Sequence, residues 1–180
     1  MNLPTYEDAV QFHGHSCPGL AMGYRMTAAA LSALRSARAD DEELVAIVEN
    51  DACGVDAVQL VAGCSFGKGN LVFRDYGKHV YTFFSRKTGR GVRVLGHRRG
   101  MPEELLDDRE GRIRWILTAP ETDVVLCREV MVDEPPRARL ARSVPCAACA
   151  EPVMETRLRV VDGRRLCIPC AERGNGGHKP

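Results

Sequence analysis

Residues 44–62, LVAIVENDACGVDAVQLVA, encode a buried strand, a short polar loop and a helix in direct succession. The uninterrupted apolar run at 44–48 is typical of a buried strand, and the run from Val55 to Ala62 predicts a helix. The loop between them carries a carboxylate, Asp51, and a thiol, Cys53. A reactive pair therefore sits where a strand ends and a helix begins.

Two helices are predicted before this strand. Thr5, followed by Asp8 three residues later, resembles a capping box for a short helix that carries Phe12. Pro18 suits the first turn of a second, longer helix, from Gly19 to about Arg38. Its apolar residues recur at helical spacing, which indicates an amphipathic helix: Leu20, Met22, Met26, Ala30, Leu31 and Leu34.

Strand signals follow at 71–73, 79–84 and 92–95, with turns at 75–78 and 88–91. This pattern predicts an antiparallel meander. A short helix is expected at 102–108 and a last strand around 124–132. Helices in one part and hairpins in another indicate an α+β core domain over residues 1–132, with helices packed on an antiparallel sheet.

The C-terminal part predicts a separate zinc module. Residues 133–145 are polar and proline-marked and predict a linker, residues 146–173 the module, and 174–180 a flexible tail. Two CxxC pairs supply four thiolates for a tetrahedral structural zinc ion: Cys146, Cys149, Cys167 and Cys170. Their spacing suits a zinc ribbon or treble clef. The alternative is redox disulfides.

The arginines of this module leave a second question open. Arg157, Arg159, Arg164 and Arg165 lie on its predicted hairpin. They offer a contact for nucleic acid or form a solvated surface. The formal net charge of the 180-residue chain is +1, which gives no global field toward nucleic acid or an anionic membrane.

Compartment is inferred from what the sequence lacks. No apolar run approaches the roughly 20 residues of a membrane helix, and the N-terminus lacks the regions of a signal peptide. We therefore expect a cytoplasmic protein without a membrane partner. Thiols stay reduced there, so paired cysteines favour a metal over a disulfide.

A second reactive segment is HGHSCPG at 13–19. Cys17 precedes a predicted helix, where free backbone N–H groups and the helix dipole favour a thiolate. Such a thiol is a metal ligand or a nucleophile. His13 and His15 share its side of an extended segment. In the later helix, Asp56 and Gln59 lie on one face.

The other candidates have less support. Cys127 lies in an apolar strand and is interpreted as a buried hydrophobic residue, whereas Cys64 stays undecided. The loop at 63–70 departs from the P-loop pattern. Lys68 and Asn70 are its candidate anion- or cofactor-binding residues, with a structural turn as the alternative. His79 and His97 are expected at the surface or in hairpins.

Several motifs together resemble the FmdE-like family, which takes its name from formylmethanofuran dehydrogenase. They are HGHSCPG (13–19), GYR (23–25), ENDACGVDAVQ (49–59), GCSFGKGN (63–70) and TGRGVRV (88–94). The resemblance covers about residues 7–132, and several members of the family carry a similar C-terminal zinc module. Ser65 stands where the family pattern has threonine, a conservative departure.

The resemblance implies a metal, zinc, in a core cleft and an intertwined homodimer. Carried over by motif, the core ligands are His15, Cys17 and Cys53, with His13 and Cys64 as alternates. The family name refers to the enzyme that fixes carbon dioxide onto methanofuran. Because such proteins occur beyond organisms that use methanofuran, the name reflects operon association more than a reaction.

Three functions remain open at this stage. The first, which we favour, is an accessory protein of a molybdenum or tungsten formylmethanofuran or formate dehydrogenase-type system, with an oxidoreductase partner. The second is an independent zinc enzyme, in which Cys17, Asp51 and Asp56 are the catalytic candidates and a carboxylate acts as general base. The third is a regulator whose tail module contacts protein or nucleic acid; the near-neutral charge argues against it.

Overall fold

The structure is a computed structural model that describes residues 3–174. The chain divides into two compact units, residues 1–138 and 139–180. Residues 175–180 of the predicted flexible tail lie outside the described part. Among the described residues, no helix combines the length and the apolar character needed to cross a lipid bilayer.

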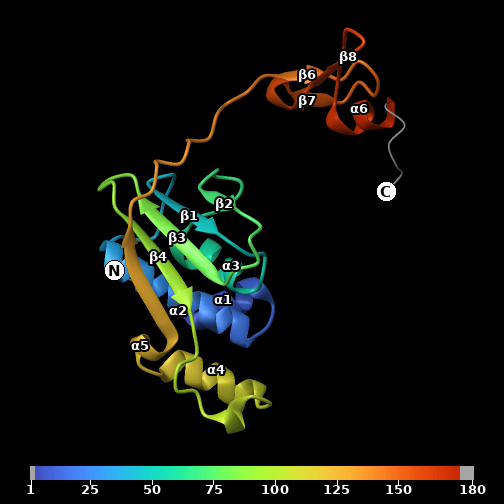
Figure 1. Ribbon diagram of the computed structural model, residues 1–180. Helices are drawn as coiled ribbons and strands as arrows, with labels where there is room; N and C mark the ends of the chain where they lie inside the picture. Colours follow the sequence, from blue (N-terminus) through green and yellow to red (C-terminus); the bar gives the residue numbers. More distant parts are fainter. Residues whose placement is uncertain (1–2, 175–180) are drawn as a thin grey trace. The chain divides into compact units, whose positions relative to one another are not determined.

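The first unit is built on one five-stranded sheet with the strand order β2-β1-β3-β4-β5 (Figure 1). The strands are β1 (Leu44–Val48), β2 (Leu71–Phe73), β3 (Val80–Ser85), β4 (Gly91–Gly96) and β5 (Val125–Val130). The pairs β1–β3, β3–β4 and β4–β5 are antiparallel, in line with the expected α+β class.

The edge strand β2 departs from the predicted meander because it runs parallel to β1, with Ile47 opposite Val72. The connection explains this: between the two strands lie α3 (Gly54–Ala57) and a π-helical segment, η1 (Val58–Ala62). A strand that returns through a helical crossover re-enters the sheet in the parallel direction, whereas a tight hairpin cannot produce this pairing.

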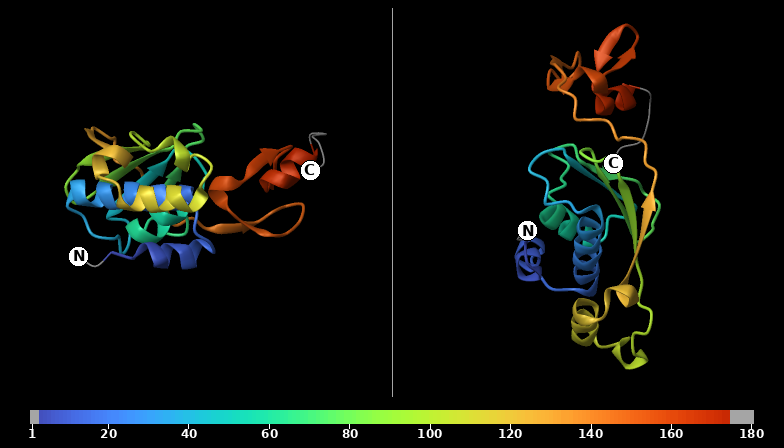
Figure 2. Two further views of the ribbon diagram at one scale, coloured as in Figure 1. Left: turned by 90° about the horizontal axis from the view of Figure 1, so that it is seen from below. Right: turned by 90° about the vertical axis from the view of Figure 1, so that its left-hand side faces the viewer.

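Helices cover one face of this sheet (Figure 2). The central one, α2 (Pro18–Leu34), packs Met26 and Leu31 against the sheet residues Tyr81, Phe83 and Val94, all of which are buried. The shorter α1 (Tyr6–His13) lies beside it and begins with the predicted capping box between Thr5 and Asp8. Alternate residues of the strands thus supply the core.

A backbone contact joins α2 to α3. A Cβ atom added to Gly23 would lie well inside van der Waals distance of the Gly54 backbone. A Cβ atom on Gly54 would in turn collide with the hydroxyl of the buried Tyr81. Only glycine permits this approach, and it places the first turn of α2 against the loop that precedes α3.

The segment after β4 contains a 3-10 turn, η2 (Glu103–Leu105), then α4 (Arg109–Thr118) and α5 (Glu121–Val124). The helix expected at 102–108 is therefore only this 3-10 turn, and the principal helix begins at Arg109. Arg25 of α2 anchors its end, because the guanidinium donates to the carbonyls of Ile116, Leu117 and Ala119 at 2.7–2.9 Å. These bonds satisfy carbonyls that a helix terminus leaves free.

The first part of the predicted linker packs on the core unit. Arg86 donates to Glu134 at 2.7 Å and to the carbonyl of Pro135 at 2.8 Å. The backbone N–H of Ala138 donates to Glu42 at 3.1 Å. The contact-defined boundary between the units accordingly follows Ala138, six residues beyond the predicted end of the core domain.

The second unit is small. It contains β6 (Ser143–Pro145) paired with β7 (Pro152–Met154), a 3-10 turn η3 (Glu155–Arg157), and β8 (Arg159–Val161) paired with β9 (Arg164–Leu166). It ends in α6 (Ile168–Gly174). Asp162 and Gly163 form the tight turn between β8 and β9, both with positive φ, as the sequence pattern predicts.

We predict that Gly23→Ala destabilises the core unit by about 1–3 kcal/mol, because the added methyl group pushes α2 away from α3. Urea unfolding followed through the single tryptophan, Trp115, reports on this unit alone. Gly67→Ala is the control, since a Cβ there meets nothing within 4 Å. Equal stability of the two variants would contradict the proposed role of the glycine contact.

Candidate metal sites

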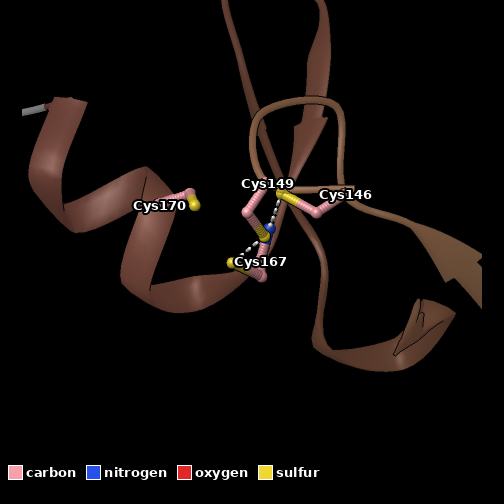
Figure 3. Close-up of side chains that lie close together, drawn as sticks. All are labelled: Cys146, Cys149, Cys167 and Cys170. Carbon is pink, nitrogen blue, oxygen red and sulfur yellow. Dashed lines mark hydrogen bonds between the residues drawn. The ribbon is translucent and has the colours of Figure 1, made fainter. Parts of the chain in front are cut away.

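The four cysteines of the tail converge, as their spacing predicts (Figure 3). Their sulfur atoms all lie within 4.8 Å of one another. Cys146 and Cys149 come from the turn after β6, Cys167 follows β9, and Cys170 projects from α6. Four mutually close sulfurs match the closed, tetrahedral arrangement of a structural zinc site.

Backbone N–H groups surround this cluster. The N–H groups of Cys167 and Ala148 donate to Cys146 Sγ at 3.3 and 3.4 Å. Donation from the backbone of Cys149, Cys167 and Ala148 lowers the pKa of Cys146 to about 6. Hydrogen bonding to Cys167 raises the pKa of Cys170 to about 12. Four thiols this close cannot all ionise without a cation, and a metal ion supplies that charge.

The second cluster lies in the core unit and consists of His13, His15 and Cys17. One ligand atom of each lies within 4.8 Å of the others, and the two imidazole rings have centroids 4.5 Å apart. Cys17 is buried, His13 is half-buried and His15 is exposed. The set therefore opens to solvent on one side, unlike the tail cluster.

Local backbone geometry brings these three residues together. His13 is the last residue of α1, and Gly14 follows in the left-handed conformation, with φ of +91°. That turn returns the chain toward α2, so His15 and Cys17 lie beside His13. Cys17 caps α2, because the backbone N–H of Leu20 donates to its sulfur at 3.3 Å. The predicted position of this thiol at a helix N-terminus is thus observed.

Asp56 reaches the cluster from α3. Its Oδ2 lies 2.6 Å from His13 Nδ1, and its Oδ1 accepts from Gln59 at 3.2 Å. This leaves His13 Nε2 on the side of Cys17, 3.9 Å from its sulfur. A carboxylate on the far nitrogen of a histidine is the arrangement that orients imidazole ligands in metal sites.

Cys53 lies next to Cys17 without belonging to the compact trio. A Cβ atom on Gly19 would be 3.3 Å from Cys53 Cβ and 3.9 Å from each of the two sulfurs. Burial first, and the neighbouring Cys17 second, raise the pKa of the Cys53 thiol. Of the ligands implied by resemblance, His15 and Cys17 therefore join the alternate His13, and Cys53 stands one step away.

A pocket of about 400 Å³, here called the Asp51 pocket, adjoins the cluster. Its polar wall includes His13, Asp51 and Asp56, and its apolar wall includes Phe66 and Phe73. Asp51 is exposed, whereas Asp56 is held by His13 and Gln59. The volume suits a small organic ligand.

The remaining predicted site residues lie elsewhere. Cys64 is fully buried; its thiol donates to the carbonyl of Leu44, and burial raises its pKa to about 12. Lys68 donates to the carbonyl of Ala39, and the Asn70 side chain donates to the carbonyls of Asp41 and Leu44. These contacts give Lys68 and Asn70 a structural role in their loop. Their part in binding a cofactor stays a prediction.

Two histidines that the sequence placed at the surface lie together in a further pocket. His79 precedes β3 and His97 follows β4, and both line a cavity with Arg98. Their shared location follows from hairpin register, since Val80 pairs with Leu95. Counting residues back from the turn at 88–91 would have paired them.

Comparison with known proteins places the core unit. A family model described as FmdE, molybdenum formylmethanofuran dehydrogenase operon, matches residues 12–126. A second, the prokaryotic DksA/TraR C4-type zinc finger, matches residues 139–173. The chain belongs to the FmdE family and carries a C4-type zinc-finger unit after the family domain.

Two individual proteins are similar. A probable S-adenosyl-L-methionine-binding protein of Archaeoglobus fulgidus is 33% identical over 192 residues, which cover 91% of this chain and 51% of the relative. The chain thus spans about half the length of that relative. The crystal structure of an FmdE-like protein of tungsten formylmethanofuran dehydrogenase, from Syntrophus aciditrophicus, matches with a TM-score of 0.71 and 25% identity. That match covers 99% of this chain and 100% of the other.

We predict that Cys170→Ser removes about one zinc ion per chain, because three thiolates and a hydroxyl bind zinc far more weakly than four thiolates. Amide NMR signals of residues 139–173 should then lose dispersion while those of the core unit persist. Elemental analysis and ¹H–¹⁵N spectra measure both effects. Cys64→Ala is the matched control and should keep its zinc; loss of zinc from that variant instead would refute the assignment.

Proposed function

We propose that this FmdE-family protein binds a second metal ion, zinc, through His13, His15 and Cys17. We further propose that it serves as an accessory protein of a molybdenum or tungsten formylmethanofuran or formate dehydrogenase-type system. The carrying observation is the convergence of two imidazoles and a thiol beside the Asp51 pocket. The descriptions of the family and of the similar crystal structure, which name formylmethanofuran dehydrogenase, support the kind of partner.

The donor set fits zinc. Imidazole and thiolate are the ligands that zinc takes most often, and three protein ligands leave a fourth position open. Cys53 lies beside Cys17 and can occupy that position or yield it to a bound molecule. An ion held there supplies a Lewis acid at the wall of the Asp51 pocket. The same open position serves a binding protein that presents or receives a ligand.

Asp56 is assigned a positioning role rather than that of a general base. Both of its oxygens are engaged, one by His13 and one by Gln59. It therefore holds the His13 ring with Nε2 toward the metal position. Asp51 is exposed in the same pocket and remains available for proton transfer.

An independent zinc enzyme is the second candidate, favoured by the pocket and by Asp51. The name of the archaeal relative adds S-adenosylmethionine to the ligands worth testing. Its sulfonium cation suits the carboxylate wall, and its adenine suits the apolar wall formed by Phe66 and Phe73. Turnover or tight binding of such a molecule would replace the accessory role by this second one.

We also propose a cytoplasmic homodimer. Eight free cysteines suit a reducing compartment. Phe66 and Tyr76 are 67% and 58% exposed and flank the short edge strand β2, whose own Phe73 is 40% exposed. Pairing of two copies over this region would cover apolar surface and an unpaired strand edge. Light scattering that gives the mass of one chain would exclude the dimer.

We predict that Asp56→Asn weakens metal binding at the core site by about 10–100-fold, because the amide no longer fixes the His13 ring as a carboxylate does. Competition titration of the full chain with a zinc chelator measures this affinity. Asp51→Asn is the matched control and should leave the affinity unchanged. If the protein is an enzyme, the control instead loses turnover while it keeps metal.

Stoichiometry provides the reference for this experiment. Elemental analysis should find one metal more in the wild-type chain than in Cys17→Ser, which removes a core ligand and leaves the tail cysteines intact. Equal metal content in the two proteins would refute the core metal site. His13, His15 and Cys17 would then form a thiol site without metal.

A further inference from the structure

A second pocket of the core unit has a volume of about 550 Å³ and lies on another side of the Ala52 loop. We call it the His79 pocket; it is lined by Gly19, Ala52, His79, His97, Arg98 and Ile116, among others. Its walls therefore come from the start of α2, from the end of the β3–β4 hairpin and from α4. The proposed metal ligands His13, His15 and Cys17 do not line it.

The electrostatic character of the His79 pocket is one-sided. Its ionisable lining residues are His79, His97 and Arg98, and no carboxylate of the described residues lines it. The first turn of α2, a 17-residue helix, adds the positive end of the helix dipole at Gly19. The Asp51 pocket differs, since Asp51 and Asp56 line it. A negative group is therefore favoured in the His79 pocket.

His79 carries an unsatisfied polar atom. Its Nε2 is buried and has no hydrogen-bond partner among the described residues. Burial, and then the charge of Arg98, lower the pKa of His79. A buried ring nitrogen without a partner costs free energy, which an oxygen of a bound ligand recovers by accepting a hydrogen bond. An anion also offsets the repulsion between an imidazolium and Arg98.

The fold fixes the position of this nitrogen. The backbone N–H of Gly96 approaches the carbonyl of His79 at 3.4 Å, which holds the end of β4 beside the start of β3. The His79 ring packs edge-on against Tyr81, with centroids 5.8 Å apart. His79 is thus held by a hairpin and by a buried aromatic ring, whereas Arg98 lies exposed at the rim.

The two pockets meet at one loop. Ala52 lines both. Gly19 lines the His79 pocket, and its Cβ position lies 3.9 Å from the sulfurs of Cys17 and Cys53. A small molecule with its anionic end in the His79 pocket therefore extends toward the thiols of the core site.

We propose that the His79 pocket binds the carboxylate or phosphate group of the small molecule on which the core site acts. Arg98 supplies the charged donor, and His79 Nε2 supplies the directed hydrogen bond. That this anion belongs to the ligand of the metal site rests on the proposed function. Anion binding by the pocket itself does not.

The test uses the full chain with inorganic phosphate and acetate as separate probes. Histidine ring NMR should show a saturable change of the His79 signals with one of the two, which identifies the ligand group. The pKa of His79 should rise in its presence, because a nearby anion stabilises the imidazolium. Arg98→Gln should weaken binding by about 10–100-fold, the range for a hydrogen bond to a charged group.

Arg99→Gln is the matched control, because it removes the same charge from the neighbouring residue, which does not line the pocket. Equal weakening by both variants, or no response of His79 to either probe, would overturn the proposal. Binding that disappears in Cys17→Ser would also overturn it, because the anion would then sit on the metal. Binding that persists in a protein without core metal would support the pocket and reject the proposed metal function separately.

Discussion

The close approach of Gly23 and Gly54 is the constraint on which the core site depends. Because neither residue has a side chain, the backbones of α2 and α3 touch. The first turn of α2 is thereby held against the loop that carries Cys53. Cys17 at one end of this contact and Asp56 at the other can then address the same His13. A wider helix separation would leave three isolated side chains in place of a site.

The two metal sites differ in what surrounds them. The buried cluster of the tail unit consists of Cys146, Leu166, Cys167 and Ala171, so half of its core is metal ligand. Such a unit has little apolar burial of its own and depends on its ion. The core cluster is attached to a large apolar core that lies between α2 and the sheet. Metal can therefore leave the core site while the fold persists, as a site that exchanges ligands requires.

Local patterns predicted the parts of the molecule that depend on short-range physics. The capping box at Thr5, the long helix from Pro18 and the four tail cysteines follow from spacing alone. The parallel strand β2 was missed, because an apolar run does not reveal the direction in which it pairs. His13 was ranked behind Cys53 as a ligand for a similar reason. The left-handed turn at Gly14, which returns the chain, is a backbone property that the sequence permits but does not require.

The loop between β1 and α3 separates two environments of opposite character. On the side of the Asp51 pocket it presents carboxylates and adjoins exposed phenylalanines; on the side of the His79 pocket it meets histidines and an arginine. Ala52 belongs to both walls, and its small side chain leaves them close together. A ligand with an anionic end and a cationic or apolar end can bind in only one direction across such a loop. That polarity fixes which of its atoms lies beside Cys17 and Cys53, so the charge of the walls selects the reacting position before any metal chemistry begins.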